Sequence, residues 1–281
     1  MLCRRQFAIG SAAIVSGGLL GGLVGSRLAQ SESSRFGRPL PIPPLIDAAK
    51  QGSAVKLTVT NGRHAFIKGK PTRSYGYSGP VLGPAIRLRR GDEVEMTVEN
   101  ALDEDTTVHW HGLLVPGRDD GGPHQVIKSG GSWRPKLRID QPASTAWFHP
   151  HLHHDTGRQV YMGLAGLIIV DDGSDASLGL PHTYGMDDLP IILQDRSFDS
   201  DGSLLYDLDP LTVQYGARGY RIIANGILAP VTAVPSGWVR LRQVSSAFQS
   251  RSSPPPHGPL LVTDITTAIR PCQAPGDSAL A

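Results

Sequence analysis

The sequence predicts an all-β protein, built as a Greek-key sandwich or barrel. Short runs of alternating apolar and polar residues recur along the chain and are separated by turn residues. The 281 residues include 33 glycines and 23 prolines, and few segments have the spacing of an amphipathic helix. Two of the expected strands carry a His-x-His motif, at residues 109–111 and 149–151. We therefore expect a β-sheet scaffold that carries a metal site.

The first strands are expected after a proline-rich linker at residues 31–50. Residues 55–59 alternate apolar side chains with lysine and threonine, which predicts a strand that is buried on one face. Residues 86–98 alternate in the same way around an Arg-Gly-Asp turn at 90–92, which predicts a half-buried β-hairpin.

Further strands are expected at residues 106–114, 133–139, 146–151 and 164–170. The last of these is continuously apolar, as is typical of a strand buried on both faces. A second unit is expected to start at residue 173, with strands at 189–193, 220–224 and 238–241 and an Asn-Gly turn at 225–226. The domain boundaries that follow are 51–172 for a first domain, 173–242 for a partial second domain and 243–281 for an irregular tail rich in proline and serine.

Residues 1–30 predict an export signal. Arg4 and Arg5, then Phe7, precede a mildly apolar run at residues 8–24, a pattern similar to a twin-arginine signal, which implies a periplasmic protein. The run falls short of the roughly 20 apolar residues that span a bilayer. We therefore expect no stable membrane span after signal removal.

Net charge and cysteine content exclude several classes of protein. The formal net charge of +2 is close to neutral, so nucleic acid is not an expected partner. The two cysteines, Cys3 and Cys272, exclude a disulfide framework and disfavour a cysteine-based zinc site.

The two His-x-His motifs predict the metal site. Side chains alternate between the faces of a strand, so His109 and His111 would point one way and Trp110 the other. His149 and His151 would share a face in the same manner, and two such strands side by side would direct four imidazoles at one place. Imidazole suits copper, zinc, iron and nickel, so the ligand type alone does not name the metal.

These motifs and their neighbours resemble the N-terminal cupredoxin domain of the multicopper oxidases. The resemblance covers roughly residues 40–242, and parts of it are similar to the bacterial periplasmic cuprous oxidases and laccase-like enzymes. The matching stretches beyond the histidines are residues 83–87, 91–92, 120–123, 147–148, 157–166, 187–190 and 225–226. The resemblance implies a cupredoxin-like Greek-key β-sandwich, with one complete domain and an incomplete second one.

The resemblance also implies a role for each site residue. His109 would bind a type 2 copper, and His111, His149 and His151 would bind a type 3 pair. Asp120 matches a loop carboxylate that assists proton delivery to reduced oxygen, although Asp-Gly is equally common turn chemistry. Arg158 and Gln159 are expected to support the histidine strand through hydrogen bonds.

The sequence departs from the family at the type 1 copper site. That site needs a cysteine thiolate with two histidines, which the family takes from a C-terminal His-Cys-His motif, and Cys272 has no such neighbours. We therefore expect a truncated chain with half of the trinuclear site. Alone it would not catalyse the family reaction, in which Cu(I) or a phenol is oxidised and dioxygen is reduced to water.

Two other hypotheses about the function remain open. One is a non-enzymatic copper-binding fragment. The other is a periplasmic structural protein of the same fold, like the lookalikes that act in cell division; those lose their copper ligands, whereas all four histidines are present here. A homo-oligomer, in which another chain supplies the missing histidines, is a further expectation.

Overall fold

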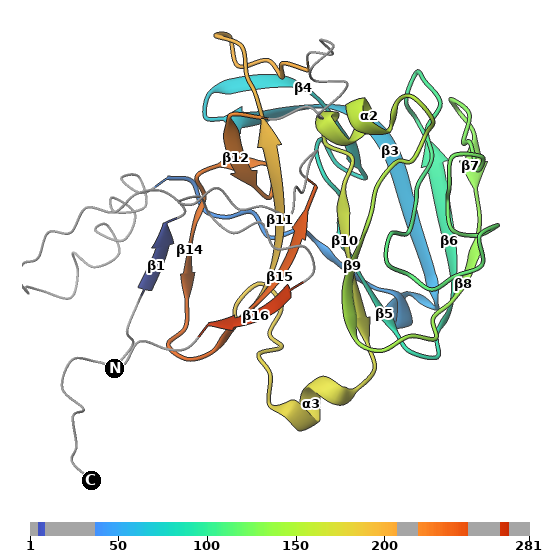
Figure 1. Cartoon of the computed structure of the whole chain (residues 1–281), viewed down its shortest axis with the longest axis vertical. Helices are drawn as coiled ribbons and strands as arrows, with labels where there is room; N and C mark the ends of the chain where they lie inside the picture. Colours follow the sequence, from blue (N-terminus) through green and yellow to red (C-terminus); the bar gives the residue numbers. More distant parts are fainter. Residues whose placement is uncertain (1–4, 9–36, 207–218, 247–264, 270–281) are drawn as a thin grey trace, which may run out of the picture.

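The structure is a computed structural model that describes residues 5–8, 37–206, 219–246 and 265–269 (Figure 1). Strands dominate these residues, so the predicted all-β fold is confirmed. Both cysteines, most of the predicted signal and most of the predicted tail lie outside the described residues. Within the described part of the chain, no helix has the length and apolar character needed to cross a membrane.

Two sheets form the first sandwich. One has the order β2 (Leu45–Asp47), β5 (Ala85–Arg89), β10 (Gly166–Asp171) and β9 (Ser144–Phe148). The other has the order β4 (Lys70–Tyr77), β3 (Ala54–Ile67), β6 (Glu93–Asn100) and β7 (Ser132–Trp133), with β8 (Lys136–Arg138) also paired to β6. The short helices η1 (Ala48–Gln51) and α2 (Thr156–Met162) connect strands of this sandwich.

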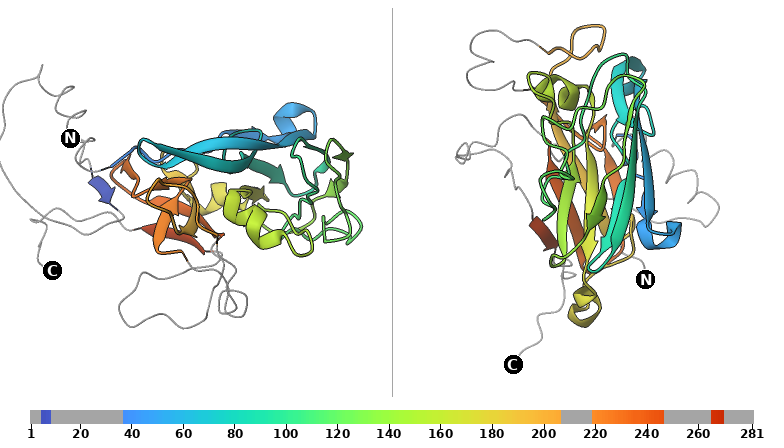
Figure 2. Two further views of the ribbon diagram at one scale, coloured as in Figure 1. Left: turned by 90° about the horizontal axis from the view of Figure 1, so that it is seen from above. Right: turned by 90° about the vertical axis from the view of Figure 1, so that its right-hand side faces the viewer.

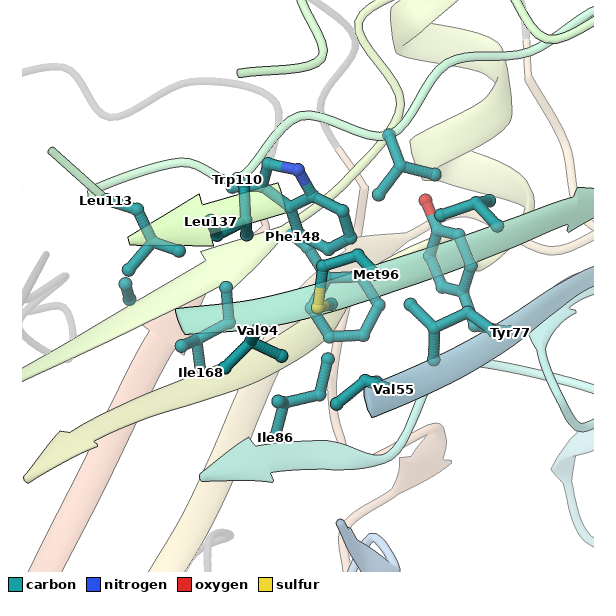
Figure 3. Packing of buried hydrophobic residues seen from close by; sticks show 14 of the residues in the cluster. Val55, Tyr77, Ile86, Val94, Met96, Trp110, Leu113, Leu137, Phe148 and Ile168 are labelled. Atoms are coloured by element: carbon teal, nitrogen blue, oxygen red, sulfur yellow. The ribbon is translucent and has the colours of Figure 1, made fainter. Parts of the chain in front are cut away.

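One apolar cluster fills the space between the two sheets (Figure 3). Val55 of β3 and Met96 of β6 come from one sheet, and Ile86 of β5 and Ile168 of β10 come from the other. All four are at most 1% exposed. The alternation that predicted these strands therefore identified their buried faces correctly. Burial of this apolar area is the main source of the stability of the sandwich.

The predicted hairpin at residues 86–98 is wrong. β5 pairs in parallel with β2 and β10, whereas β6 pairs in parallel with β3, so the two strands belong to opposite sheets. The turn between them carries the chain across the sandwich: Arg90 N–H donates to the Asp171 carbonyl, and Gly91 N–H to the Ile139 carbonyl. Alternation identifies the buried face of a strand, but it does not identify the neighbouring strand.

The predicted strand at residues 106–114 is also not continuous. It makes only two isolated bridges, Thr106 with Ile127 and His109 with His149. The chain turns just after Trp110, because Leu113 N–H donates back to the Trp110 carbonyl and Gly112 takes a φ of +92°.

A further sheet packs against the outside of the first sandwich (Figure 2). Its order is β13 (Ile227–Leu228), β12 (Arg221–Ala224), β11 (Asp188–Arg196), β15 (Val239–Ser245) and β16 (Ile265–Ile269). Leu167 and Ile169 of β10 share an apolar cluster with Ile192 of β11 and Val244 of β15. Three further elements lie outside this sheet. The helix α3 (Ser174–Leu178) links β10 to β11, and β1 (Arg5–Ala8) pairs with β14 (Val231–Val234).

The Asn225-Gly226 turn between β12 and β13 agrees with the sequence prediction. The two residues have φ values of +48° and +80°, as a two-residue hairpin turn requires.

Candidate metal centre

The two His-x-His motifs lie side by side in antiparallel register. His109 N–H donates to the His149 carbonyl at 2.7 Å, and His149 N–H donates to the His109 carbonyl at 3.2 Å. One step along the register, Trp147 N–H donates to the His111 carbonyl at 3.2 Å. Residues that are far apart in the sequence are thereby held within reach of one another.

Two aromatic side chains anchor these segments in the core (Figure 3). Trp110 and Phe148 are both 0% exposed, and their ring centroids are 6.0 Å apart. Because side chains alternate along an extended chain, burial of Trp110 and Phe148 turns their histidine neighbours to the opposite face.

Three of the four predicted ligands converge at this face. The ligand nitrogens of His109, His111 and His149 all lie within 4.8 Å of one another. His111 Nδ1 and His149 Nε2 are 3.2 Å apart. Two imidazole nitrogens, each about 2.0 Å from one ion in near-tetrahedral geometry, would be roughly 3.3 Å apart. The spacing of these two nitrogens therefore fits a shared metal ion.

His151 lies beside this cluster. Its ring centroid is 5.4 Å from that of His109 and 6.0 Å from that of His149. His151 and His111 are exposed to solvent, whereas His149 is buried. The structure thus gathers the nitrogens of His109, His111 and His149 at one point and places the His151 ring next to that of His109.

Backbone carbonyls orient two of the rings. His109 Nδ1 lies 2.9 Å from the Asp120 carbonyl, and His149 Nδ1 lies 2.8 Å from the Pro150 carbonyl. A ring nitrogen that faces a carbonyl oxygen donates its proton to it, which leaves Nε2 of both rings as the nitrogen that could face a metal ion.

Burial lowers the pKa of His149 to about 3, and nearby histidine charges add to this effect while the Pro150 carbonyl opposes it. His149 is therefore neutral near neutral pH and needs no deprotonation before it binds a metal.

Asp120 lies behind His109, on the side away from the ligand nitrogens. Its carboxylate Oδ1 is 3.3 Å from His109 Nδ1, and its carbonyl accepts a hydrogen bond from Trp110 N–H at 3.1 Å. Gly121 makes this approach possible: it has a φ of +78°, and a Cβ there would lie only 1.7 Å from the Val108 carbonyl oxygen. The sequence indicated a turn at Asp-Gly, but not that the turn packs against a histidine strand.

Sequence reasoning missed the hydroxyls of Thr106 and Thr107. Both threonines are 0% exposed, and the available signal was two polar residues in a strand next to His109. Thr107 Oγ1 accepts a hydrogen bond from His151 N–H at 2.5 Å. Thr106 Oγ1 donates to Gln159 Oε1 at 2.8 Å, so Gln159 contacts the histidine segment, as the sequence suggested.

The donor set suits a transition metal. Several imidazoles at one point favour copper, zinc, iron or nickel over magnesium or calcium. Trp147 stacks on the His149 ring with 4.0 Å between centroids, so one side of the cluster is shielded. Exposure of His111 leaves the other side accessible to additional ligands, as an open metal site requires.

Comparisons with known proteins agree with this donor set. Residues 58–175 match a family model described as multicopper oxidase. The multicopper oxidase mco of Staphylococcus aureus is 38% identical over 218 residues, which are 76% of this chain and 48% of that protein. The cell division protein FtsP of Escherichia coli is 35% identical over 253 residues, which are 89% of this chain and 51% of that protein.

Among solved structures, a bacterial laccase-like multi-copper oxidase, CueO, from Ochrobactrum sp. is 48% identical, with a TM-score of 0.70. The match covers 74% of this chain and 47% of that one. The chain spans about half the length of the relatives it matches.

Proposed function

The chain belongs to the multicopper oxidase family, and we propose that it contributes the first-domain half of a trinuclear copper site. The convergence of His109, His111 and His149, with their ligand nitrogens within 4.8 Å, carries this proposal. Bound copper would supply the one-electron redox chemistry with which the family reduces dioxygen to water.

We assign the histidines to the copper types that the sequence implies. His111 Nδ1 and His149 Nε2, 3.2 Å apart, would hold one ion of the type 3 pair, and His151, set apart from them, would serve the other. His109 would hold the type 2 ion through Nε2, because its Nδ1 faces the Asp120 carbonyl. The assignments of His109, His111 and His149 each use a nitrogen that points away from a backbone carbonyl or toward another ligand.

We propose that Asp120 assists proton delivery to reduced oxygen at the site. Its Oδ1 is 3.3 Å from His109 Nδ1, so the carboxylate is close enough to orient that ring and places an acid–base group next to the site. In the assembled protein, dioxygen would be the oxidant and Cu(I) or a phenol the reductant. The 281 residues contain no His-Cys-His motif, so by themselves they would bind copper without oxidising these reductants.

A second candidate is a non-catalytic role in cell division. The similarity to FtsP over 89% of the chain supports it. The two candidates differ in what they require of the histidines: a copper site needs all of the converging nitrogens, whereas a structural role needs only a folded surface.

Copper binding separates the two candidates. The purified chain is dialysed against Cu(II), and bound copper is counted by elemental analysis and examined by electron spin resonance. We expect bound copper that is lost in His149→Ala and kept in His182→Ala. The control removes an exposed histidine whose hydrogen bond, among the described residues, is to the Leu180 carbonyl in its own loop. A wild-type chain that binds no copper would favour the cell-division role. Oxygen uptake with a phenol, or an intense blue band, would contradict the half-site assignment.

We also propose that the chain is exported to the periplasm by the twin-arginine route. The support is the Arg4-Arg5 motif and the apolar run that follows it. Replacement of both arginines by lysine should retain the protein in the cytoplasm on cell fractionation. Unchanged export would contradict this route.

A further inference from the structure

We propose that Thr107 is a positioning residue that holds His151 in place beside the histidine cluster. This inference rests on the proposed copper site and names a residue that controls it. The Thr107 hydroxyl is the acceptor for the His151 backbone N–H, at 2.5 Å. Thr107 itself is 0% exposed.

The register of the two histidine segments explains why a hydroxyl is needed there. His109 and His149 exchange both of their main-chain hydrogen bonds. In an antiparallel pair, the next such exchange comes two residues along each segment, which would place Thr107 opposite His151. At that position the described acceptor for His151 is the side chain of Thr107. The threonine hydroxyl therefore extends the pairing by one step, beyond Pro150, which has no N–H to donate.

The chain at Thr107 is held in place through its neighbour, Thr106. The neighbouring Thr106 donates to Gln159 Oε1 at 2.8 Å, and Gln159 is 0% exposed. Gln159 Nε2 donates in turn to Glu104 Oε1 at 3.0 Å and to the Asp105 carbonyl at 2.8 Å. Gln159 belongs to α2, the helix that follows the His151 loop. The segment before His109 is thus fixed to a buried amide of the helix that follows the His151 loop.

The His151 ring depends on this backbone contact. Among the described residues its ring nitrogens have no hydrogen-bond partner of the kind that orients His109 and His149. Its ring neighbours are the other histidines, at centroid distances of 5.4 and 6.0 Å. The position of the fourth ligand is therefore set through its main chain, and Thr107 is the side chain that sets it.

Thr107→Val tests the inference, because it keeps the shape of the side chain and removes the acceptor. Thr107→Ser restores a hydroxyl. Thr145→Val is the matched control: it changes a buried threonine of β9 whose hydroxyl has no hydrogen-bond partner among the described residues. Two quantities are measured, the hydrogen-exchange rate of the His151 amide in the metal-free chain and the affinities of successive Cu(II) ions in a titration.

In Thr107→Val we expect faster exchange of the His151 amide and an unchanged affinity for the first copper ion. A second ion should bind about 10- to 100-fold more weakly, the usual effect of losing a residue that orients a metal ligand. Thr107→Ser and Thr145→Val should behave like the wild type. In a His151→Ala background, Thr107→Val should cause no additional loss, because its effect acts through His151.

The outcomes distinguish this inference from the proposed function. Equal exchange and equal copper affinities in Thr107→Val and the wild type would overturn the positioning role alone. Weakening of the first ion, or an equal loss in the His151→Ala background, would show a general structural role and overturn it too. A wild-type chain that protects the His151 amide but binds no copper would overturn the proposed function and, with it, the ligand role of His151.

Discussion

The first sandwich and the sheet packed on its outside differ in the kinds of side chain that they bury. The cluster inside the sandwich is apolar throughout, with Trp110, Phe148 and Met96 among its largest members. The outer sheet instead buries three arginines and an aspartate, all at most 5% exposed: Arg196, Arg240, Arg242 and Asp188. The sandwich is held together by buried area and shape, whereas the outer sheet combines apolar contacts with buried charges that need partners.

The charged pair at the centre of this difference joins two neighbouring strands. Arg242 Nε of β15 donates to both carboxylate oxygens of Asp188 in β11, at 2.8 and 2.9 Å. Burial raises the pKa of Asp188 and lowers the pKa of Arg242 even though their charges attract. Desolvation therefore outweighs attraction, and the pair fixes how the strands meet more than it adds net stability.

The largest expected effect is in the outer sheet. Asp188→Ala leaves Arg242 buried beside Arg240 with its main partner removed, which should lower the free energy of unfolding by about 3–5 kcal/mol. Urea denaturation measures this change in the free energy of unfolding. The double change Asp188→Leu with Arg242→Met should cost far less than the single change, because no charge is left unpaired. Equal losses in both variants would mean that packing, not charge, holds this sheet.

The sandwich should instead be destabilised by added side-chain volume in its apolar core. In Gly166→Ala the new Cβ would lie 2.0 Å from Cζ of Phe148, a ring that is 0% exposed and has no room to retreat. We expect a loss of about 3 kcal/mol in the free energy of unfolding. Gly117→Ala is the control, since nothing lies within 4 Å of a Cβ there. A Gly166→Ala variant as stable as this control would show that the core is looser than described.

Acid should weaken the metal-free sandwich through His149. Its folded pKa of about 3 lies below the unfolded value of 6.5, so below pH 6.5 the unfolded chain gains a proton that the folded chain does not. Stability is therefore lost as pH falls from 6.5 toward 3, by at most about 2 kcal/mol at pH 5. The measurement is thermal unfolding at pH 7 and pH 5, with His149→Gln as the reference. An identical pH dependence in this variant would contradict the assignment to His149.

The smallest effects compare two buried glutamines. Both amide atoms of Gln194, in β11, have no hydrogen-bond partner among the described residues. Gln141, in the sandwich, accepts a bond from Leu114 N–H and donates to the Gly112 carbonyl and to Ser144 Oγ. We expect Gln194→Met to raise stability by up to about 1 kcal/mol and Gln141→Met to lower it by about 1–2 kcal/mol. A loss in both variants would show that Gln194 has a partner after all.

Local alternation predicted most of the scaffold. Residues 55–59 lie in β3 with the expected buried face, because a period of two reports burial directly. The continuous apolar run at 164–170 overlaps β10, which is buried on both faces as expected. Local alternation could not predict which strands pair with one another. β5 and β6 follow one another in the chain but lie in opposite sheets, since partners are chosen by contacts between distant residues.

The candidate site was likewise predictable from the sequence only in part. Alternation around Trp110 placed His109 and His111 on one face, and the structure brings His149 to them. The sequence did not reveal that His151 lies nearer to His109 than to His149, that Asp120 contacts His109 from behind, or that a hydroxyl holds the His151 backbone. Each of these depends on a turn or a side-chain hydrogen bond between segments, which has no periodic signature.

The parallel pairing of the sheets also bears on how the chain folds. β5 pairs with β10 through Ile86 and Ile168, β3 with β6 through Leu57 and Val98, and β11 with β15 in a similar long-range register. Such contacts close long loops, so folding should take milliseconds to seconds, as in other proteins dominated by non-local strand pairs. Until β10 arrives, β5 has an unpaired edge, and this interval is when two copies can pair wrongly and aggregate.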